Sequence, residues 1–169
     1  MMKHIFMASL LACVTAGAQQ IPNGGFEQDL TDWDTGGDRN MSLAVAEAAH
    51  SGKFGLRVTD ESDRLGSSIT SLPTEVVPGA RYELGCWSRG VSGTGGVGIY
   101  FRFLNENGKA LGKDKNITLP ADSKEWKRYA VSATAPEGAV SAVVWIHSYA
   151  KDMPVVDLDD FELKTISTE

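Results

Sequence analysis

The stretch "VGIYFRFL", residues 97–104, alternates apolar side chains with other residues and so predicts a β-strand. The apolar face of that strand would carry Val97, Ile99, Phe101 and Phe103, and the opposite face Gly98, Tyr100 and Arg102. Such a strand buries its apolar face against a second layer of structure. The stretch therefore predicts one layer of a β-sandwich.

The same short alternating pattern recurs along the chain, and no long segment has the 3.6-residue period of a helix. Turn residues such as Gly, Pro, Asn and Asp separate the runs. We predict strands over 53–59, 66–72, 80–89, 97–104, 126–134, 139–148 and 155–163. The glycine-rich segment 88–98 is predicted to be a mobile loop. The pattern is typical of an all-β sandwich.

Length and charge narrow the class of protein. The 169 residues amount to about one domain, long enough to bury a core. The net charge is −6, and the sequence has no run of Lys and Arg that could follow a phosphate backbone. We therefore expect no nucleic-acid partner.

The N-terminal stretch "MMKHIFMASLLACVTAGAQQ" has the pattern of a secretory signal peptide, because Lys3 precedes an apolar run and small residues follow it. The run is too short for a transmembrane span. We predict a signal peptide over 1–18 and a single exported domain over 19–169, either secreted or held in the cell envelope. In an alternative interpretation, Cys13 carries a lipoprotein anchor. Cleavage after Ala18 would leave Cys86 as the only cysteine, so no internal disulfide is expected.

Three predicted strands combine an apolar face with an opposite face of rings and charges. These opposite faces carry Glu83, Trp87, Arg89, Tyr100, Arg102, Trp145 and His147. If the three strands share a sheet, the seven side chains line one outer surface. Aromatic rings beside hydrogen-bonding groups suit a sugar, whose C–H faces stack on rings while its hydroxyls need donors and acceptors. The alternative is that the tryptophans are half-buried under a loop and the arginines are solvated.

The C-terminal stretch "VVDLDDFEL", residues 155–163, places Asp159 beside Asp160 in a predicted strand. Ionised carboxylates repel each other and resist burial unless a cation lies between them. The pair therefore indicates either a cation site or a solvated β-bulge.

Six stretches of the sequence follow one another in a characteristic order: "IPNGGFEQDLTDWDTGG" at 21–37, "AHSGKFGLRV" at 49–58, "VVPGARYELGCWSRG" at 76–90, "FLNENGKAL" at 103–111, "WKRYAVSATAPEGAVSAVVWI" at 126–146 and "VVDLDDFEL" at 155–163. In this order they resemble carbohydrate-binding modules of the family 4/9/16/22 type, which are galactose-binding-domain-like jelly rolls. The resemblance covers essentially the whole chain after the leader. It implies a jelly-roll β-sandwich that binds a poly- or oligosaccharide without catalysis. It also implies that Trp33 packs the N-terminal segment.

The resemblance further implies a structural calcium ion held by the "NGGFE" stretch, the "HSGK" turn and the C-terminal acids. Its ligands would be the carboxylates of Glu27 and Asp160 and backbone oxygens near Gly25 and Lys53, with Asp159 as the alternate acid. Calcium takes about six to eight oxygen ligands, so this set is chemically suitable. Some relatives have a further acid before the turn, where this sequence offers only Glu47 and His50.

Two other function classes stay open. One is a ligand-free structural or adhesion domain at the cell surface, acting alone or with a secreted enzyme or a surface partner. The other is a polysaccharide lyase, in which Tyr100, His147 and Arg102 would supply a base and a charge neutraliser. A glycosidase needs two carboxylates beside the scissile bond, and the predicted face offers only Glu83.

Overall fold

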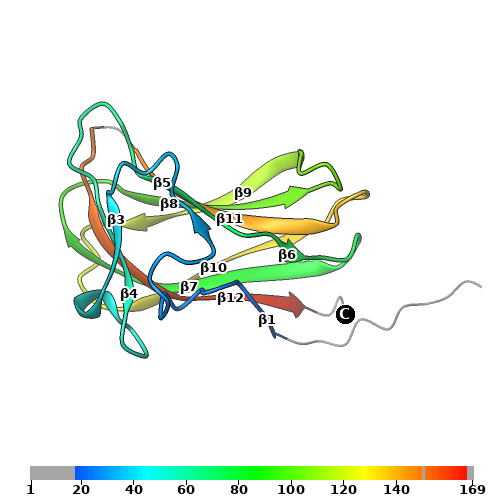
Figure 1. Ribbon diagram of the computed structural model, residues 1–169, viewed down its shortest axis with the longest axis horizontal. Helices are drawn as coiled ribbons and strands as arrows, with labels where there is room; N and C mark the ends of the chain where they lie inside the picture. Colours follow the sequence, from blue (N-terminus) through cyan, green and yellow to red (C-terminus); the bar gives the residue numbers. More distant parts are fainter. Residues whose placement is uncertain (1–17, 150, 167–169) are drawn as a thin grey trace, which may run out of the picture.

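The computed structural model describes residues 18–149 and 151–166, which form two antiparallel sheets stacked face to face (Figure 1). Apart from Ala18, the predicted leader with Cys13 lies outside the described residues. Within the described ranges, no helix is long and apolar enough to cross a membrane. The predicted all-β sandwich is confirmed.

Each sheet contains six strands. Sheet A has the order β10-β7-β12-β4-β3, with β1 also paired to β12, and sheet B has the order β2-β5-β11-β8-β9, with β6 also paired to β11. The strands of sheet A are β1 (Ala18–Gln20), β3 (Ser42–Val45), β4 (Gly55–Thr59), β7 (Arg81–Ser92), β10 (Lys127–Thr134) and β12 (Val155–Ile166). The strands of sheet B are β2 (Trp33–Asp34), β5 (Ser68–Ser71), β6 (Thr74–Glu75), β8 (Gly96–Leu104), β9 (Ala110–Pro120) and β11 (Ser141–Ser148). A short 3-10 helix, η1 (Ala46–Ala48), follows β3.

All the strands predicted from the sequence are present, but the predicted mobile loop over 88–98 is wrong. Strands β7 and β8 extend into this segment and leave a tight turn between them. Gly93 and Gly95 adopt left-handed backbone angles there, and a Cβ at Gly93 would lie 2.2 Å from the carbonyl oxygen of Met153. Glycine is therefore favoured here because it permits a close approach of two backbone segments, and not because it makes the segment mobile.

The core lies between the sheets and follows the predicted alternation. The apolar face of β8 is buried, and Tyr82, Leu84 and Cys86 of β7 face it from the other sheet. Trp33 is buried as well, with its ring centroid 5.1 Å from Phe26. The predicted packing role of Trp33 is confirmed.

An ion pair is buried on the outer side of sheet A. Asp157 of β12 is fully buried and lies in register between Arg57 of β4 and Arg89 of β7. Its carboxylate accepts hydrogen bonds from Arg57 Nε at 2.7 Å and Nη2 at 3.0 Å, and from Arg89 Nε at 3.0 Å. Three strands of the sheet are thereby joined through one carboxylate.

We predict that Asp157→Asn lowers the free energy of unfolding by about 3 kcal/mol, because both guanidinium groups then face a neutral amide. Urea denaturation followed by tryptophan fluorescence measures this change. The control is Asp63→Asn, since Asp63 pairs with Arg64 at 3.8 Å with both side chains exposed, and we expect a change below about 0.5 kcal/mol. Equal effects of the two substitutions would contradict the role given to Asp157.

Candidate functional site

The seven predicted binding residues do not form one surface, so the prediction of a single face is wrong. Strand β7 belongs to sheet A, whereas β8 and β11 belong to sheet B. Glu83, Trp87 and Arg89 therefore lie on the outer face of sheet A. The other four residues lie on the outer face of sheet B. Alternation along each strand gives the correct face, but it carries no information on which sheet a strand joins.

The four residues on sheet B lie together. Trp145 of β11 pairs in register with Tyr100 of β8, and their ring centroids are 4.6 Å apart. His147 stacks on Trp145 at 4.9 Å with 20° between the rings, and the guanidinium carbon of Arg102 lies 5.1 Å from the Trp145 ring centroid. Four of the seven predicted side chains therefore share a surface, and the other three do not.

Tyr149 completes this group and was missed from the sequence. Its hydroxyl lies 2.6 Å from the hydroxyl of Tyr100, and its ring lies 5.7 Å from His147. Gly98 leaves the space for this contact, because a Cβ there would be 2.7 Å from the Tyr149 oxygen. Tyr149 follows the predicted strand by one residue and has the same parity as His147, which is the signal that could have found it. We call Tyr100, Arg102, Trp145, His147 and Tyr149 the sheet B aromatic cluster.

Hydrogen bonds hold two rings of the cluster in place. Trp145 Nε1 donates to Ser68 Oγ at 2.9 Å. His147 Nδ1 lies 2.6 Å from the carbonyl oxygen of Ser67, which accepts only, so Nδ1 carries the hydrogen. In the neutral ring, Nε2 of His147 is then the nitrogen that accepts a further hydrogen bond.

The arginine of the cluster is held by a carboxylate. Arg102 binds Asp114 of β9 through two nitrogens, with Nη2 2.7 Å from Oδ2 and Nε 3.0 Å from Oδ1. This pair is half-exposed and close to neutral in total charge. Asn116 lies on β9 as well and pairs in register with Tyr100 of β8. It adds an exposed amide beside the rings. Sequence reasoning did not predict β9 and so missed Asp114 and Asn116.

The cluster also alters the acidity of a phenol. Burial raises the pKa of Tyr100 to about 12, and the hydrogen bond to Tyr149 acts in the same direction. Tyr100 is therefore protonated across the physiological range of pH.

On sheet A, the predicted binding residues are partly covered. The ring of His50 stacks on Trp87 at 4.1 Å with 13° between the planes. Trp126 lies edge-on to His50 at 5.1 Å, and the guanidinium of Arg89 lies 5.0 Å from the Trp126 ring centroid. Glu83 forms an ion pair with Arg128 at 2.7 Å. The alternative interpretation of tryptophans half-buried beneath a loop describes this face of sheet A.

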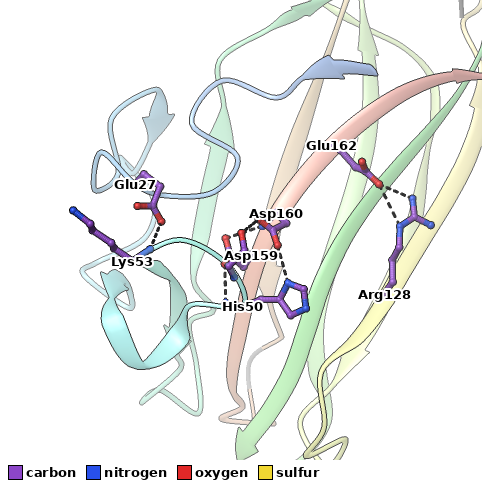
Figure 2. A network of polar contacts seen from close by, with 8 residues as sticks. Glu27, His50, Lys53, Arg128, Asp159, Asp160 and Glu162 are labelled. Atoms are coloured by element: carbon purple, nitrogen blue, oxygen red, sulfur yellow. Dashed lines mark hydrogen bonds and ion pairs between the residues drawn. The ribbon is translucent and has the colours of Figure 1, made fainter. Parts of the chain in front are cut away.

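The predicted calcium ligands come from three segments that meet beside β12 (Figure 2). Glu27 Oε1 accepts hydrogen bonds from the backbone N–H groups of Lys53 at 2.8 Å and Phe54 at 3.0 Å. The position of a Cβ at Gly25 would be 3.8 Å from Asp159 Oδ1 and 4.0 Å from Asp160 Oδ1. The structure thus brings Glu27, Gly25, Lys53, Asp159 and Asp160 together at the bulge of β12.

The two adjacent aspartates differ in environment. Asp159 is fully buried and accepts hydrogen bonds from the backbone N–H groups of His50 at 2.7 Å and Ser51 at 3.0 Å. Asp160 lies at a bulge of β12 with a φ of 53°, and its Oδ2 is 2.7 Å from His50 Nδ1. The predicted bulge is present, but only Asp160 is partly solvated.

Burial raises the pKa of Asp159 to about 6, although three backbone N–H groups oppose the shift. At Glu27 the backbone N–H groups of Phe54 and Lys53 lower the pKa. Among the described residues, no group of three or more His, Cys, Asp or Glu side chains is arranged to hold a metal ion. An ion at this bulge would need backbone oxygens in addition to the carboxylates.

Residues 18–152 match the sequence profile of the carbohydrate binding domain family CBM_4_9. The chain belongs to this family. A search of curated proteins finds no significant match. The module is thus placed by its family profile, which agrees with the resemblance found in the sequence.

Solved structures agree with the fold of the module. "Family 16 Carbohydrate Binding Module-2" is 18% identical with a TM-score of 0.63, and the match covers 85% of this chain and 97% of the other. TmCBM61, solved with β-1,4-galactotriose, is 23% identical with a TM-score of 0.58, covering 85% and 96%. The CBM22-1 xylan-binding domain of Paenibacillus barcinonensis Xyn10C is 19% identical with a TM-score of 0.60, covering 86% and 94%. At these identities the likeness shows the jelly-roll fold.

We predict that the Tyr100 phenol makes the stability of the module fall at high pH. Below about pH 10 the phenol is protonated in the folded and unfolded chains, so its contribution is complete. Between about pH 10 and pH 12 the unfolded chain ionises first, and the free energy of unfolding falls. Urea denaturation at about pH 9 and pH 11 should show the wild type losing stability relative to Tyr100→Phe. Parallel losses in the two proteins would contradict the shifted pKa.

Proposed function

We propose that the module binds a neutral poly- or oligosaccharide on the sheet B aromatic cluster and does not cleave it. The observation that carries this proposal is the set of contiguous rings on one sheet, edged by an Arg–Asp pair and an exposed amide. The membership of the chain in a carbohydrate binding domain family supports it.

The chemistry of the cluster suits a sugar ring. Aromatic faces and edges attract the C–H groups of a pyranose, and hydroxyl groups need directed hydrogen-bond partners. Nε2 of His147, the tyrosine hydroxyls and the amide of Asn116 offer such partners. Since Ser68, Ser67 and Asp114 already fix the rings and the guanidinium, binding would order few further side chains.

Three observations favour binding over catalysis. A phenol with a pKa of about 12 is a poor base at neutral pH, which weakens the lyase alternative. The charge of Arg102 is taken up by Asp114, so Arg102 is not a free neutraliser for a uronic acid. Glu83, the one carboxylate predicted beside the rings, lies on the other sheet and pairs with Arg128.

The predicted signal peptide leads us to propose that the module acts outside the cytoplasm, secreted or in the cell envelope. A secreted enzyme or a cell-surface protein is the kind of partner that such a module would serve. A ligand-free adhesion role is the second candidate, because both sheets form ordered outer surfaces without a bound sugar. The two functions differ in whether loss of a ring from sheet B has any effect.

We predict that Trp145→Ala reduces retention on immobilised polysaccharide by about tenfold or more, because buried aromatic anchors dominate binding energy. Affinity electrophoresis through gels containing xylan, galactan or β-glucan measures the retention. Trp126→Ala is the matched control, because it removes an indole that lies on the side of sheet A. Retention of this variant on the gels should be unchanged. If folded Trp145→Ala is retained like the wild type on every gel that retards it, the binding face is wrong.

We also propose a structural calcium ion at the bulge of β12, held by Glu27, Asp160 and backbone oxygens near Gly25 and Lys53, with Asp159 as the alternate acid. The donor set fits, because it consists of oxygen atoms and brings two or three negative charges together. Among the described residues, neither Glu27 nor Asp159 forms an ion pair with Lys or Arg, in contrast to Asp157 and Glu162. A cation beside Asp159 would favour its ionised form and offset the cost of burial.

We predict that chelation lowers the melting temperature of the module and that added calcium restores it, since a ligand bound only by the folded state stabilises it. Differential scanning calorimetry with a chelator and with excess calcium measures the shift. Glu27→Gln and Asp160→Asn should abolish it, whereas Asp63→Asn should retain it. An unchanged melting temperature on chelation would rule out the ion.

A further inference from the structure

The outer side of sheet A contains a hollow of about 650 Å³ that the proposed sheet B face does not use. It lies between the N-terminal segment 20–28, strand β7 and the bulged part of β12. The polar and aromatic residues that line it are Trp87, Gln20, Asn23, Gln28, Glu162 and the two proposed calcium ligands Glu27 and Asp160. Since the two sheets face away from each other, this hollow is separate from the sheet B aromatic cluster.

Trp87 gives the hollow an aromatic wall. His50 covers one face of the indole at 4.1 Å and does not itself line the hollow. The indole therefore borders the hollow with its remaining surface. The stacking also fixes the ring, because His50 is tied to Asp160 by a 2.7 Å contact.

Apart from Glu27 and Asp160, whose carboxylates the proposed calcium ion would compensate, the polar lining side chains are neutral or ion-paired. Gln20 and Gln28 are exposed, and within the part of the chain that the structure describes their side-chain amides make no hydrogen bond. Glu162 forms an ion pair with Arg128 at 2.8 Å (Figure 2). It also pairs with Lys164 at 2.6 Å. The hollow thus combines a fixed indole with hydrogen-bonding side chains, a combination that the sheet B face also has.

We propose that this hollow is a second saccharide subsite, so that the module binds one glycan chain on each sheet and cross-links them. The volume falls within the range of about 300–1,000 Å³ for small-molecule sites. An extended peptide is disfavoured, because the bulged residues Asp160 and Phe161 already donate their backbone N–H groups to Asp159 Oδ1 and to the carbonyl oxygen of Gly24. The proposal rests on the proposed function, since it assigns the same class of ligand to a second face.

The test compares four variants with the wild type in the presence of calcium. Trp87→Ala and the double variant Gln20→Ala/Gln28→Ala alter the hollow, and Trp145→Ala alters the sheet B aromatic cluster. Trp126→Ala is the control, because Trp126 lines neither site. None of these residues is a proposed calcium ligand. The glutamine variant matters if Trp87→Ala fails to fold, because exposed amides can be removed without loss of core packing.

Isothermal titration calorimetry with xylohexaose, β-1,4-galactotriose and oligosaccharides of any other retained polysaccharide gives the number of sites. We expect two sites in the wild type and in Trp126→Ala, and one in Trp145→Ala. In the hollow variants, we expect affinity at the second site to fall by about tenfold or more. Turbidity of mixtures with soluble polysaccharide should report cross-linking in the wild type and its loss in either class of variant.

The outcomes separate the two proposals. A single site that Trp145→Ala removes and the hollow variants leave intact would overturn the second subsite and keep the proposed function. A single site that only the hollow variants weaken would keep the subsite and overturn the assignment to sheet B. Binding of none of the saccharides by the wild type would overturn both.

Discussion

The structure depends on the compensation of negative charge along β12, a central strand of sheet A. Its three aspartates each find a different partner: Asp157 binds two arginines, Asp159 binds the backbone of the turn at 50–51, and Asp160 binds His50. The bulge that turns Asp160 outward also lets Phe161 N–H donate to the carbonyl oxygen of Gly24 at 2.9 Å. Buried carboxylates are costly without partners, so these contacts fix where β4, β7 and the N-terminal segment lie.

Both sheets carry the same combination on their outer sides, a tryptophan stacked on a histidine and an arginine over an indole. On sheet A this group lies against the turn that contains His50, and Arg89 is committed to buried Asp157. On sheet B the rings lie along paired strands, and Arg102 is paired with half-exposed Asp114. On sheet A these residue types therefore serve mainly in packing, with part of Trp87 left to the hollow, whereas on sheet B they remain available to a ligand. The two faces differ because the turn that contains His50 covers the group on sheet A. Residue types alone do not reveal that cover.

Alternation in the sequence predicted the sandwich and the inward side of β7, β8 and β11, because a buried face must be apolar. It could not assign β7 to a sheet, since strand pairing depends on contacts between distant segments, and this misplaced Trp87, Arg89 and Glu83. Strand β9 escaped prediction because its middle, from Lys113 to Asn116, is polar on an edge that faces water. The meeting of Glu27 with Asp159 and Asp160 came from family resemblance, as no local pattern links residues so far apart.

The central claim is that Trp145 stacks on or beside a bound sugar, and the indole N–H signals of the four tryptophans test it directly. The module, labelled with ¹⁵N, would be titrated with an oligosaccharide from a polysaccharide that retards it. The account predicts that the Trp145 signal shifts while those of buried Trp33 and of Trp126 stay in place. Saturating binding that leaves the Trp145 signal unmoved would contradict it.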